Sequence, residues 1–232
     1  MKWWKHIPNA LTMLNLIFGT LAIISMANAL IPTALILMLL CLVADILDGM
    51  LARKMGVSGP LGVQLDSLAD VVSFGVLPAM MIFYMGARFG GEFPGQQAVG
   101  VIGALVAASA GLRLARFNID EKPRNYFWGL ATPSGAMMIA GWLWAQHIGK
   151  DYGLGVADHH WLIILLPAII LIAYQIPLRL PGLKSPKEGL ITLGIISAGM
   201  ILGLVLLGPI SIPLGFLTYL LAGILNHFIR WY

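Results

Sequence analysis

The sequence predicts an all-α, polytopic membrane protein with about eight transmembrane helices, and three observations support this. Hydrophobic residues make up 59% of the 232 residues and charged residues only 10%, whereas about a quarter of a soluble domain is charged. Apolar runs long enough to cross a hydrocarbon core, which takes about 18 residues or more, recur along the chain. Lys and Arg residues fall almost entirely into alternate connections between these runs.

The apolar runs give the expected spans in chain order. Their ranges are 9–28, 31–53, 60–85, 97–115, 131–148, 160–177, 189–207 and 211–229. Proline is tolerated in a first helical turn, and prolines accordingly stand at or near several of these starts: Pro8, Pro32, Pro60, Pro133 and Pro213. No cleavage-site pattern follows the first run, so we expect it to be a transmembrane helix and not a signal peptide. We expect residues 1–232 to form one integral-membrane domain.

The distribution of positive charge predicts the topology. With eight spans, the side that holds both termini carries Lys2, Lys5, Arg53, Lys54, Arg113, Arg116, Lys122, Arg124, Arg179, Lys184, Lys187 and Arg230. The other side carries Arg88 and Lys150. Because short cytoplasmic loops collect Lys and Arg, we expect both termini in the cytoplasm and the protein in the cell (inner) membrane. The net charge of +4 then follows from topology and indicates no nucleic-acid partner.

Acidic residues concentrate at the cytoplasmic ends of the second and third spans. Asp45, Asp48, Asp66 and Asp70 are four of the ten acidic residues in the chain, and an ionised carboxylate within a span usually marks a functional site because it costs a few kcal/mol. The first two are three residues apart and the last two four apart, so each pair shares a helix face. A short, glycine-rich connection makes the two helices antiparallel neighbours, so we expect the four carboxylates to converge in one cavity.

Converging carboxylates indicate a divalent-cation site. The charges would repel one another unless neutralised, and an all-oxygen ligand set favours hard cations, namely Mg²⁺ or Mn²⁺, with Ca²⁺ as a further candidate occupant. Four aspartates can hold two ions about 3.5–4 Å apart, an arrangement used in phosphoryl transfer. Gly49, Ala52 and Gly62 are small residues along the approach to the carboxylates. Arg53 has two possible roles. Its guanidinium either binds a phosphate oxygen through two N–H groups, or it is one of the Lys and Arg residues that collect on the cytoplasmic side of a membrane protein.

The spacing of these residues resembles the signature of the CDP-alcohol phosphatidyltransferase family. The matching string is Asp45-x2-Asp48-Gly49-x2-Ala52-Arg53-x8-Gly62-x3-Asp66-x3-Asp70. The resemblance implies a helical-bundle membrane fold in which the first three aspartates bind metal and Asp70 both contacts the metal site and acts as the base. It also implies a CDP-linked lipid as donor and an alcohol as acceptor. We expect a catalytic core over about residues 1–180, two additional helices in 189–229, and a homodimer, which is common in the family.

Three further stretches resemble the phosphatidylserine synthase branch of that family. They are DSLADVVSFGVLPA (66–79), LRLARFNID (112–120) and YFWGLATPSGA (126–136). The resemblance implies CDP-diacylglycerol and L-serine as substrates and phosphatidylserine and CMP as products. One position departs from the pattern, because Ala131 stands where the family commonly has proline, although Pro133 is present.

A serine acceptor carries a carboxylate, which needs a cation to bind it. Arg113 and Arg116, three residues apart at the cytoplasmic end of the fourth span, suit that role, and Asn118 would add an amide contact. Both arginines are alternatively topology determinants, and Asn118 is alternatively a helix cap.

Polar residues recur every three positions along the first span, at Asn9, Thr12 and Asn15. Such stripes commonly join membrane helices to one another. The family resemblance instead places Asn9 and Thr12 against the nucleotide of the CDP-lipid.

Two rival functions stay open at the level of sequence. The same chemistry with glycerol phosphate, inositol phosphate or an archaeal ether lipid is one, and the phosphorylated acceptors would need an extra basic pocket. A divalent-cation transporter is the other, since it also carries intramembrane carboxylates. A transporter has no need, however, of Ala52, Arg53 and Gly62 at these intervals. The single cysteine, Cys41, excludes an intrachain disulfide.

Overall fold

Helices dominate the computed structural model, which describes residues 3–89, 96–119, 127–128, 130–149, 162–176 and 179–180. In chain order the elements are a 3₁₀ turn η1 (Trp3–His6), α1 (Ile7–Ala27), α2 (Ile31–Met55), α3 (Pro60–Asp70), a π-helical segment η2 (Val71–Val76), α4 (Leu77–Phe89), α5 (Gln96–Ile119), α6 (Thr132–Gly149) and α7 (Leu162–Gln175). The strands β1 (Phe127–Trp128) and β2 (Arg179–Leu180) pair antiparallel. These two strands, of two residues each, are the only β-structure within the described ranges.

Helices occupy the first six expected spans, while 189–207 and 211–229 lie outside the described residues. Among the residues described, four helical stretches are long and apolar enough to cross a membrane: Ile7–Ala27, Ile31–Met55, Pro60–Arg88 and Ala98–Ile119. A shorter apolar helical stretch covers Ile164–Gln175. The protein is therefore an integral-membrane helical bundle.

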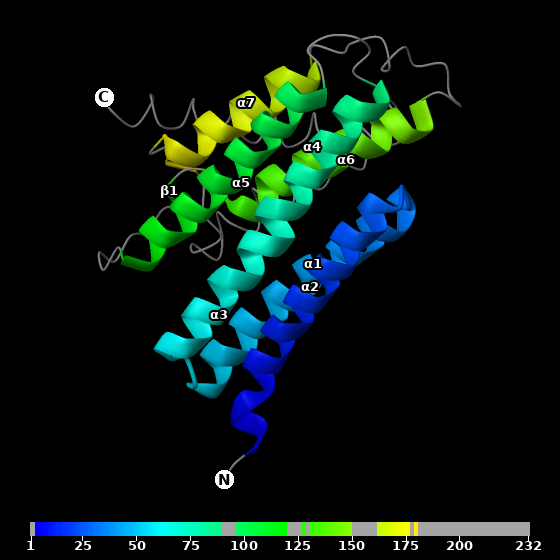
Figure 1. Ribbon diagram of the computed structural model, residues 1–232. Helices are drawn as coiled ribbons and strands as arrows, with labels where there is room; N and C mark the ends of the chain where they lie inside the picture. The colour runs from blue at the N-terminus through cyan, green and yellow to red at the C-terminus, as the bar shows by residue number, and fades with distance from the viewer. Residues whose placement is uncertain are drawn as a thin grey trace.

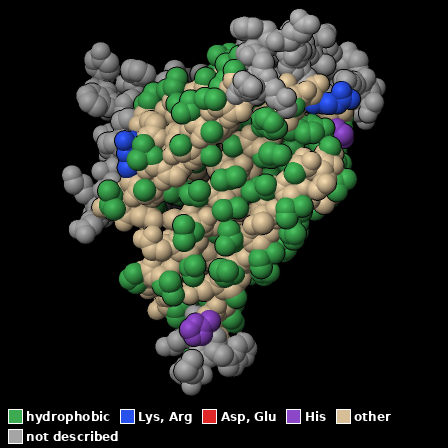
Figure 2. All heavy atoms as spheres, viewed as in Figure 1, with side chains coloured by type: hydrophobic (Ala, Val, Ile, Leu, Met, Phe, Trp, Pro, Cys, Tyr) green, Lys and Arg blue, Asp and Glu red, His purple; other side chains and the backbone are tan. Residues whose placement is uncertain are grey.

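The surface agrees with a lipid environment. Ile36, Val43 and Leu105 are each more than half exposed, as are many other large apolar side chains, and extensive exposed apolar surface marks contact with lipid or an apolar partner. Figure 2 shows apolar side chains spread over one face and the few Lys and Arg side chains at its margins, with no acidic side chain among the described residues of that face. Of the four signature aspartates, Asp48 and Asp70 are buried, and Asp45 and Asp66 are partly exposed.

The hairpin of α1 and α2 lies beside the long rod made of α3, η2 and α4; α5 and α7 lie on the other side of that rod, and α6 crosses behind it and contacts both α4 and α2 (Figure 1). Glycines allow close approach of helices, as is common in membranes. A Cβ at Gly103 of α5 would lie 2.8 Å from the Ala79 carbonyl oxygen of α4. The buried side chains of the rod, including Phe74, Leu77 and Met81, pack into the core between these helices.

The end of α2 determines how the two aspartate-bearing helices meet. Gly56 caps α2 in the left-handed conformation, with φ of 62°, which glycine adopts without the strain that a Cβ would cause. Its N–H donates to the Arg53 carbonyl at 3.2 Å, and the Val57 N–H donates to the Ala52 carbonyl at 3.1 Å. The chain then enters α3 at Pro60. This tight reversal joins the end of α2 to the start of α3, and α1 packs against both helices.

A π-helical segment interrupts the rod directly after Asp70. Pro78 has no N–H to donate and its ring conflicts with the carbonyl four residues earlier, that of Phe74. The wider turns of η2 precede Pro78 and return to α-helix at Leu77. Since π-helical segments recur at functional sites, the position of η2 next to the signature aspartates is relevant to the site.

Candidate active site

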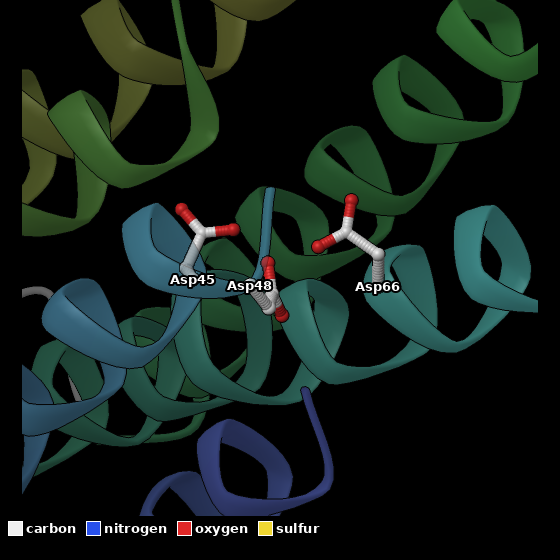
Figure 3. A group of neighbouring side chains, drawn as sticks. All are labelled: Asp45, Asp48 and Asp66. Atoms are coloured by element: carbon white, nitrogen blue, oxygen red, sulfur yellow. The ribbon is translucent and has the colours of Figure 1, made fainter. Parts of the chain in front are cut away.

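Three signature aspartates converge at the junction of α2 and α3. One carboxylate oxygen from each of Asp45, Asp48 and Asp66 lies within 4.8 Å of the others. Figure 3 shows that Asp48 lies between the other two in this view, with α2 supplying two side chains and α3 the third. Asp48 is only 4% exposed, whereas Asp45 and Asp66 are partly exposed.

Asp70 lies outside this group of three. It is four residues beyond Asp66, which displaces it about 6 Å along α3, away from the start of that helix at Pro60. Asp70 is 7% exposed, and its Oδ1 accepts a hydrogen bond of 3.4 Å from the Asn15 side-chain amide of α1. The structure therefore brings three of the four predicted carboxylates together and places the fourth one turn deeper.

The donor set fits a hard divalent cation. All three groups offer carboxylate oxygens, the ligands preferred by Mg²⁺, Mn²⁺ and Ca²⁺. Oxygens on opposite sides of such an ion lie about 4–5 Å apart, twice the usual ion-to-oxygen distance. The three carboxylate oxygens lie no more than 4.8 Å from one another, a separation that fits such an ion.

A cavity of about 170 Å³ opens beside the carboxylates. Its lining includes every residue predicted from the sequence to contact the CDP-lipid: Asn9, Thr12, Gly49, Ala52, Arg53 and Gly62. Asp48 and Asp66 also line it. Residues from α1, α2 and α3 thus form one hollow that has acidic groups on one side and an arginine on its rim.

Small residues keep this cavity open. A Cβ at Gly49 would lie 3.4 Å from the Arg53 Nη1, and a Cβ at Gly62 would lie 3.3 Å from the Asn9 Oδ1. The guanidinium and the amide therefore occupy the space that larger side chains at the two glycines would enter. Arg53 is exposed, in the last turn of α2, where its charge faces the cavity mouth.

Thr12 has a role that sequence reasoning did not identify. Its hydroxyl lies 2.6 Å from the Asp48 Oδ2 and 3.1 Å from the Pro8 carbonyl oxygen, and the residue is 4% exposed. Partners of this kind orient ligating carboxylates and are part of many metal sites. The sequence indicated that Thr12 lies on the polar stripe of the first span, but it did not show that this stripe brings Thr12 to Asp48.

The two predicted acceptor-binding arginines have different surroundings. The Nη1 of Arg113 donates to the Thr132 Oγ1 at 3.0 Å, and its Nε is buried with no hydrogen-bond partner among the described residues. Arg116 is exposed, and its Nη1 donates to the Gln175 Oε1 at 2.7 Å. Arg113 therefore keeps a buried, unpaired N–H, whereas Arg116 is engaged at the surface with α7.

Asn118, the third predicted acceptor contact, joins two helices. Its side-chain amide donates to the Ser67 Oγ of α3 at 2.8 Å. This bond ties the end of α5 to the helix that carries Asp66 and Asp70. An interhelical link of this kind positions the two helices relative to one another.

The end of α7 forms hydrogen bonds with the residues on either side of Ala131, the position that departs from the family pattern. The Tyr174 hydroxyl donates to the Thr132 carbonyl at 3.1 Å, and the Leu130 N–H donates to the Ala173 carbonyl at 3.1 Å. The turn around Ala131 is thus anchored by hydrogen bonds without a proline at that position. These polar contacts of α7 were missed because its sequence looks uniformly apolar.

Comparisons with known proteins agree with the site. Residues 5–177 match the family model described as CDP-alcohol phosphatidyltransferase. The chain is 37% identical over 137 residues to archaetidylserine synthase of Methanothermobacter thermautotrophicus. It is 36% and 39% identical over 136 residues to proteins named CDP-diacylglycerol–serine O-phosphatidyltransferase from Bacillus subtilis and Methanocaldococcus jannaschii.

Each of these three matches covers 58% of this chain, and they cover 56%, 73% and 59% of the respective relatives. The alignment thus takes in little more than half of two of the relatives. The family model, by contrast, extends over well more than half of this chain and includes the whole aspartate signature. The chain therefore belongs to the CDP-alcohol phosphatidyltransferase family.

Proposed function

We propose that this chain transfers the phosphatidyl group of CDP-diacylglycerol to the hydroxyl of L-serine, giving phosphatidylserine and CMP. The observation that carries the proposal is the single cavity lined by all six predicted CDP-lipid contacts and flanked by clustered carboxylates. The names of the three relatives support serine as the acceptor, because each specifies serine or a serine-linked lipid.

Asp45, Asp48 and Asp66 would hold divalent cations, Mg²⁺ or Mn²⁺, and we propose two ions with Asp70 as a further contact. Cations held there would neutralise the diphosphate and would stabilise the charge on the departing CMP. Thr12 fixes the Asp48 carboxylate through its 2.6 Å contact. Arg53, on the cavity rim, contacts a phosphate oxygen of the donor.

Asp70 is the proposed general base. The serine hydroxyl oxygen forms a bond to the phosphorus of the phosphatidyl group, its proton passes to the Asp70 carboxylate, and the phosphorus–oxygen bond to CMP breaks. Asp70 lies one turn from Asp66 and is largely shielded from solvent, which suits a group that must accept a proton from the acceptor and not from bulk water.

Arg113 is the better placed of the two arginines for the serine carboxylate. Its unpaired, buried Nε is a donor that a carboxylate can satisfy, and leaving such a donor unpaired costs about 1–3 kcal/mol. Arg116 and Asn118 already have side-chain partners on α7 and α3. We propose Arg113 as the main contact, with the other two residues supporting it.

Replacement of Arg53 by Lys is expected to raise the KM for CDP-diacylglycerol about tenfold with a smaller change in kcat, because a point charge replaces a forked donor. The measurement is initial rate against donor concentration in mixed micelles. Lys54→Ala is the matched control, since Lys54 is the neighbouring exposed cation of α2. An unchanged KM in Arg53→Lys would exclude forked phosphate binding by this residue.

Replacement of Arg113 by Lys is expected to raise the KM for serine at least about tenfold, which corresponds to loss of one charge-assisted contact. The same change at Arg116 is expected to have a smaller effect, because its partner is Gln175. Rates measured against serine concentration at saturating donor distinguish the two variants. A larger KM effect at Arg116 than at Arg113 would reverse the assignment.

We also propose the finer topology: eight spans, both termini in the cytoplasm, a catalytic core over about residues 1–180, two further helices in 189–229, and a homodimer. The asymmetric distribution of Lys and Arg supports this orientation. Arg53 and Lys54 end α2 next to the cavity, whereas Arg88 lies near the far end of the long rod (Figure 1). We therefore propose that the active site lies at the cytoplasmic face of the inner membrane, which the Arg53 and Lys54 charges beside the cavity support.

A radiolabel assay tests the proposed function. Purified protein would be given CDP-diacylglycerol, Mg²⁺ or Mn²⁺, and serine in competition with glycerol 3-phosphate and inositol phosphate. Labelled phosphatidylserine as the main product is the expected result, and a glycerol phosphate or inositol phosphate lipid as the main product would contradict it. A parallel arm with a CDP-activated archaeal ether lipid measures donor preference, which the archaetidylserine synthase relative makes relevant. Cation flux into liposomes without lipid product would indicate transport.

A further inference from the structure

The side-chain amide of Asn15 bridges two residues that flank the start of the π-helical segment. Its Nδ2 donates to the Asp70 Oδ1 at 3.4 Å, and its Oδ1 accepts a hydrogen bond of 2.7 Å from the Ser73 Oγ. Asn15 and Ser73 are both fully buried. Three side chains from α1, α3 and η2 therefore form one continuous hydrogen-bonded chain that ends at the proposed base.

The chemistry of the three groups fixes the direction of this chain. An ionised carboxylate can only accept hydrogen bonds, so Asn15 must turn its NH₂ group towards Asp70. Its carbonyl oxygen then faces Ser73, whose hydroxyl supplies the donor that this oxygen needs. Without the hydroxyl, the buried Asn15 Oδ1 would lose this donor, and the amide orientation would depend on its bond to Asp70 alone.

The local packing is specific to this contact. A Cβ at Gly19 of α1 would collide with the Ser73 Oγ, so the glycine permits α1 to approach η2 closely enough for Asn15 to reach both partners. The Asn15 backbone carbonyl oxygen accepts a bond from the Cys41 Sγ of α2 at 3.4 Å and lies 3.2 Å from the Ser73 Oγ, whose one hydrogen has its shorter contact, 2.7 Å, with the Asn15 Oδ1. The Asn15 position is thus held from two other elements.

We propose that Asn15 is a positioning residue that holds the Asp70 carboxylate in the orientation in which it takes the proton of the acceptor hydroxyl, and that Ser73 acts through Asn15 by fixing its amide. This inference rests on the proposed function, because it assigns a role to the base of that reaction. It gives the Ser-Phe-Gly run after the last aspartate, at residues 73–75, a physical task. A structural role alone, joining helices, would affect stability but not the rate per folded molecule.

Kinetics of three variants test the inference. Asn15→Leu removes the amide at similar volume, and is expected to lower kcat about 10- to 100-fold, as is usual for a partner that orients an active-site group. The KM values for CDP-diacylglycerol and serine are expected to stay within about twofold, since the binding contacts are untouched. Ser73→Ala is expected to lower kcat by a smaller factor. The double variant is expected to match Asn15→Leu, because Ser73 has no effect once the amide is gone.

The control is Ser25→Ala, which removes a buried hydroxyl from the same helix. Ser25 is bonded to the Leu21 carbonyl at 2.9 Å and lies ten residues, or about 15 Å, along α1 from Asn15. This variant is expected to keep the kcat of the wild type.

Two results would overturn the inference. One is a wild-type kcat in folded Asn15→Leu. The other is a Ser73→Ala substitution that lowers kcat by the same factor in the wild-type protein and in the Asn15→Leu variant. If gel filtration shows that Asn15→Leu does not fold, Ser73→Ala decides alone, and an unchanged kcat in it rejects the inference. Failure of the proposed function is separate, because the wild-type protein would then form no phosphatidylserine.

Discussion

Asp70→Asn is expected to abolish turnover almost completely while CDP-diacylglycerol still binds. The amide has nearly the size of the carboxylate but cannot accept the proton of the serine hydroxyl, and general-base catalysis contributes about 10²–10⁴-fold to a rate. The carboxylate is 7% exposed and bonded to Asn15, so water cannot easily replace it. The measurements are kcat in the radiolabel assay and equilibrium binding of labelled CDP-diacylglycerol.

The control for this variant is the same substitution at Asp151, an aspartate outside the signature, for which wild-type kcat is expected. Wild-type turnover in Asp70→Asn would refute the assignment of the base. Loss of donor binding together with turnover would show that Asp70 acts mainly by holding the cations and not as the base.

Asp48→Asn is expected to reduce activity by more than about 100-fold, beyond the 10- to 100-fold typical of residues that only orient a ligand. Asp48 is the most buried of the three converging carboxylates and the one that Thr12 holds. Removing one negative ligand weakens divalent-cation affinity, so excess Mn²⁺ is expected to restore part of the rate. The measurement is initial rate as a function of Mn²⁺ concentration.

Thr12→Val is the matched comparison for Asp48→Asn, because it removes the hydroxyl that contacts the carboxylate but keeps the carboxylate itself. It is expected to need more Mn²⁺ for half-maximal rate, with a shift of about 10- to 100-fold. An activity of Asp48→Asn equal to wild type, with no change in its requirement for Mn²⁺, would exclude Asp48 as a ligand.

The sequence predicted the first six helices and the convergence of three of the four signature aspartates. Apolar runs fix membrane helices because the hydrocarbon core requires about 20 apolar residues per span, and the first six expected ranges are helical. The spacing of Asp45 and Asp48 predicted their common face, and the three carboxylates do converge. The prediction that α2 and α3 pack directly as neighbours missed α1, which packs against both helices.

Helix ends were predicted less well than helix positions. The third expected span ended at residue 85 and the fourth at 115, whereas the corresponding helices continue to Phe89 and Ile119. A hydropathy pattern detects where the apolar stretch ends, but a helix can continue into a polar environment because its backbone hydrogen bonds do not depend on lipid. The extra turn of α5 carries Asn118, whose bond to Ser67 of α3 depends on that continuation.

The contacts that orient the site could not be predicted, because they join residues far apart in the chain. Thr12 meets Asp48, Asn15 meets both Asp70 and Ser73, and Tyr174 meets Thr132. Periodicity tells which face of a helix a residue occupies, but not which neighbouring helix it meets. The different surroundings of the two acceptor-site arginines and the π-helical segment likewise follow from tertiary packing.

Counting the Mn²⁺ ions bound to purified protein, by electron paramagnetic resonance of free Mn²⁺ during titration, tests the central claim that carboxylates of α2 and α3 form a divalent-cation site. About two ions per chain are expected for the wild type, as in other paired-metal sites, and none for the combined Asp45→Asn, Asp48→Asn and Asp66→Asn variant. Equal Mn²⁺ binding by the two proteins, or none by either in the presence of CDP-diacylglycerol, would contradict that claim.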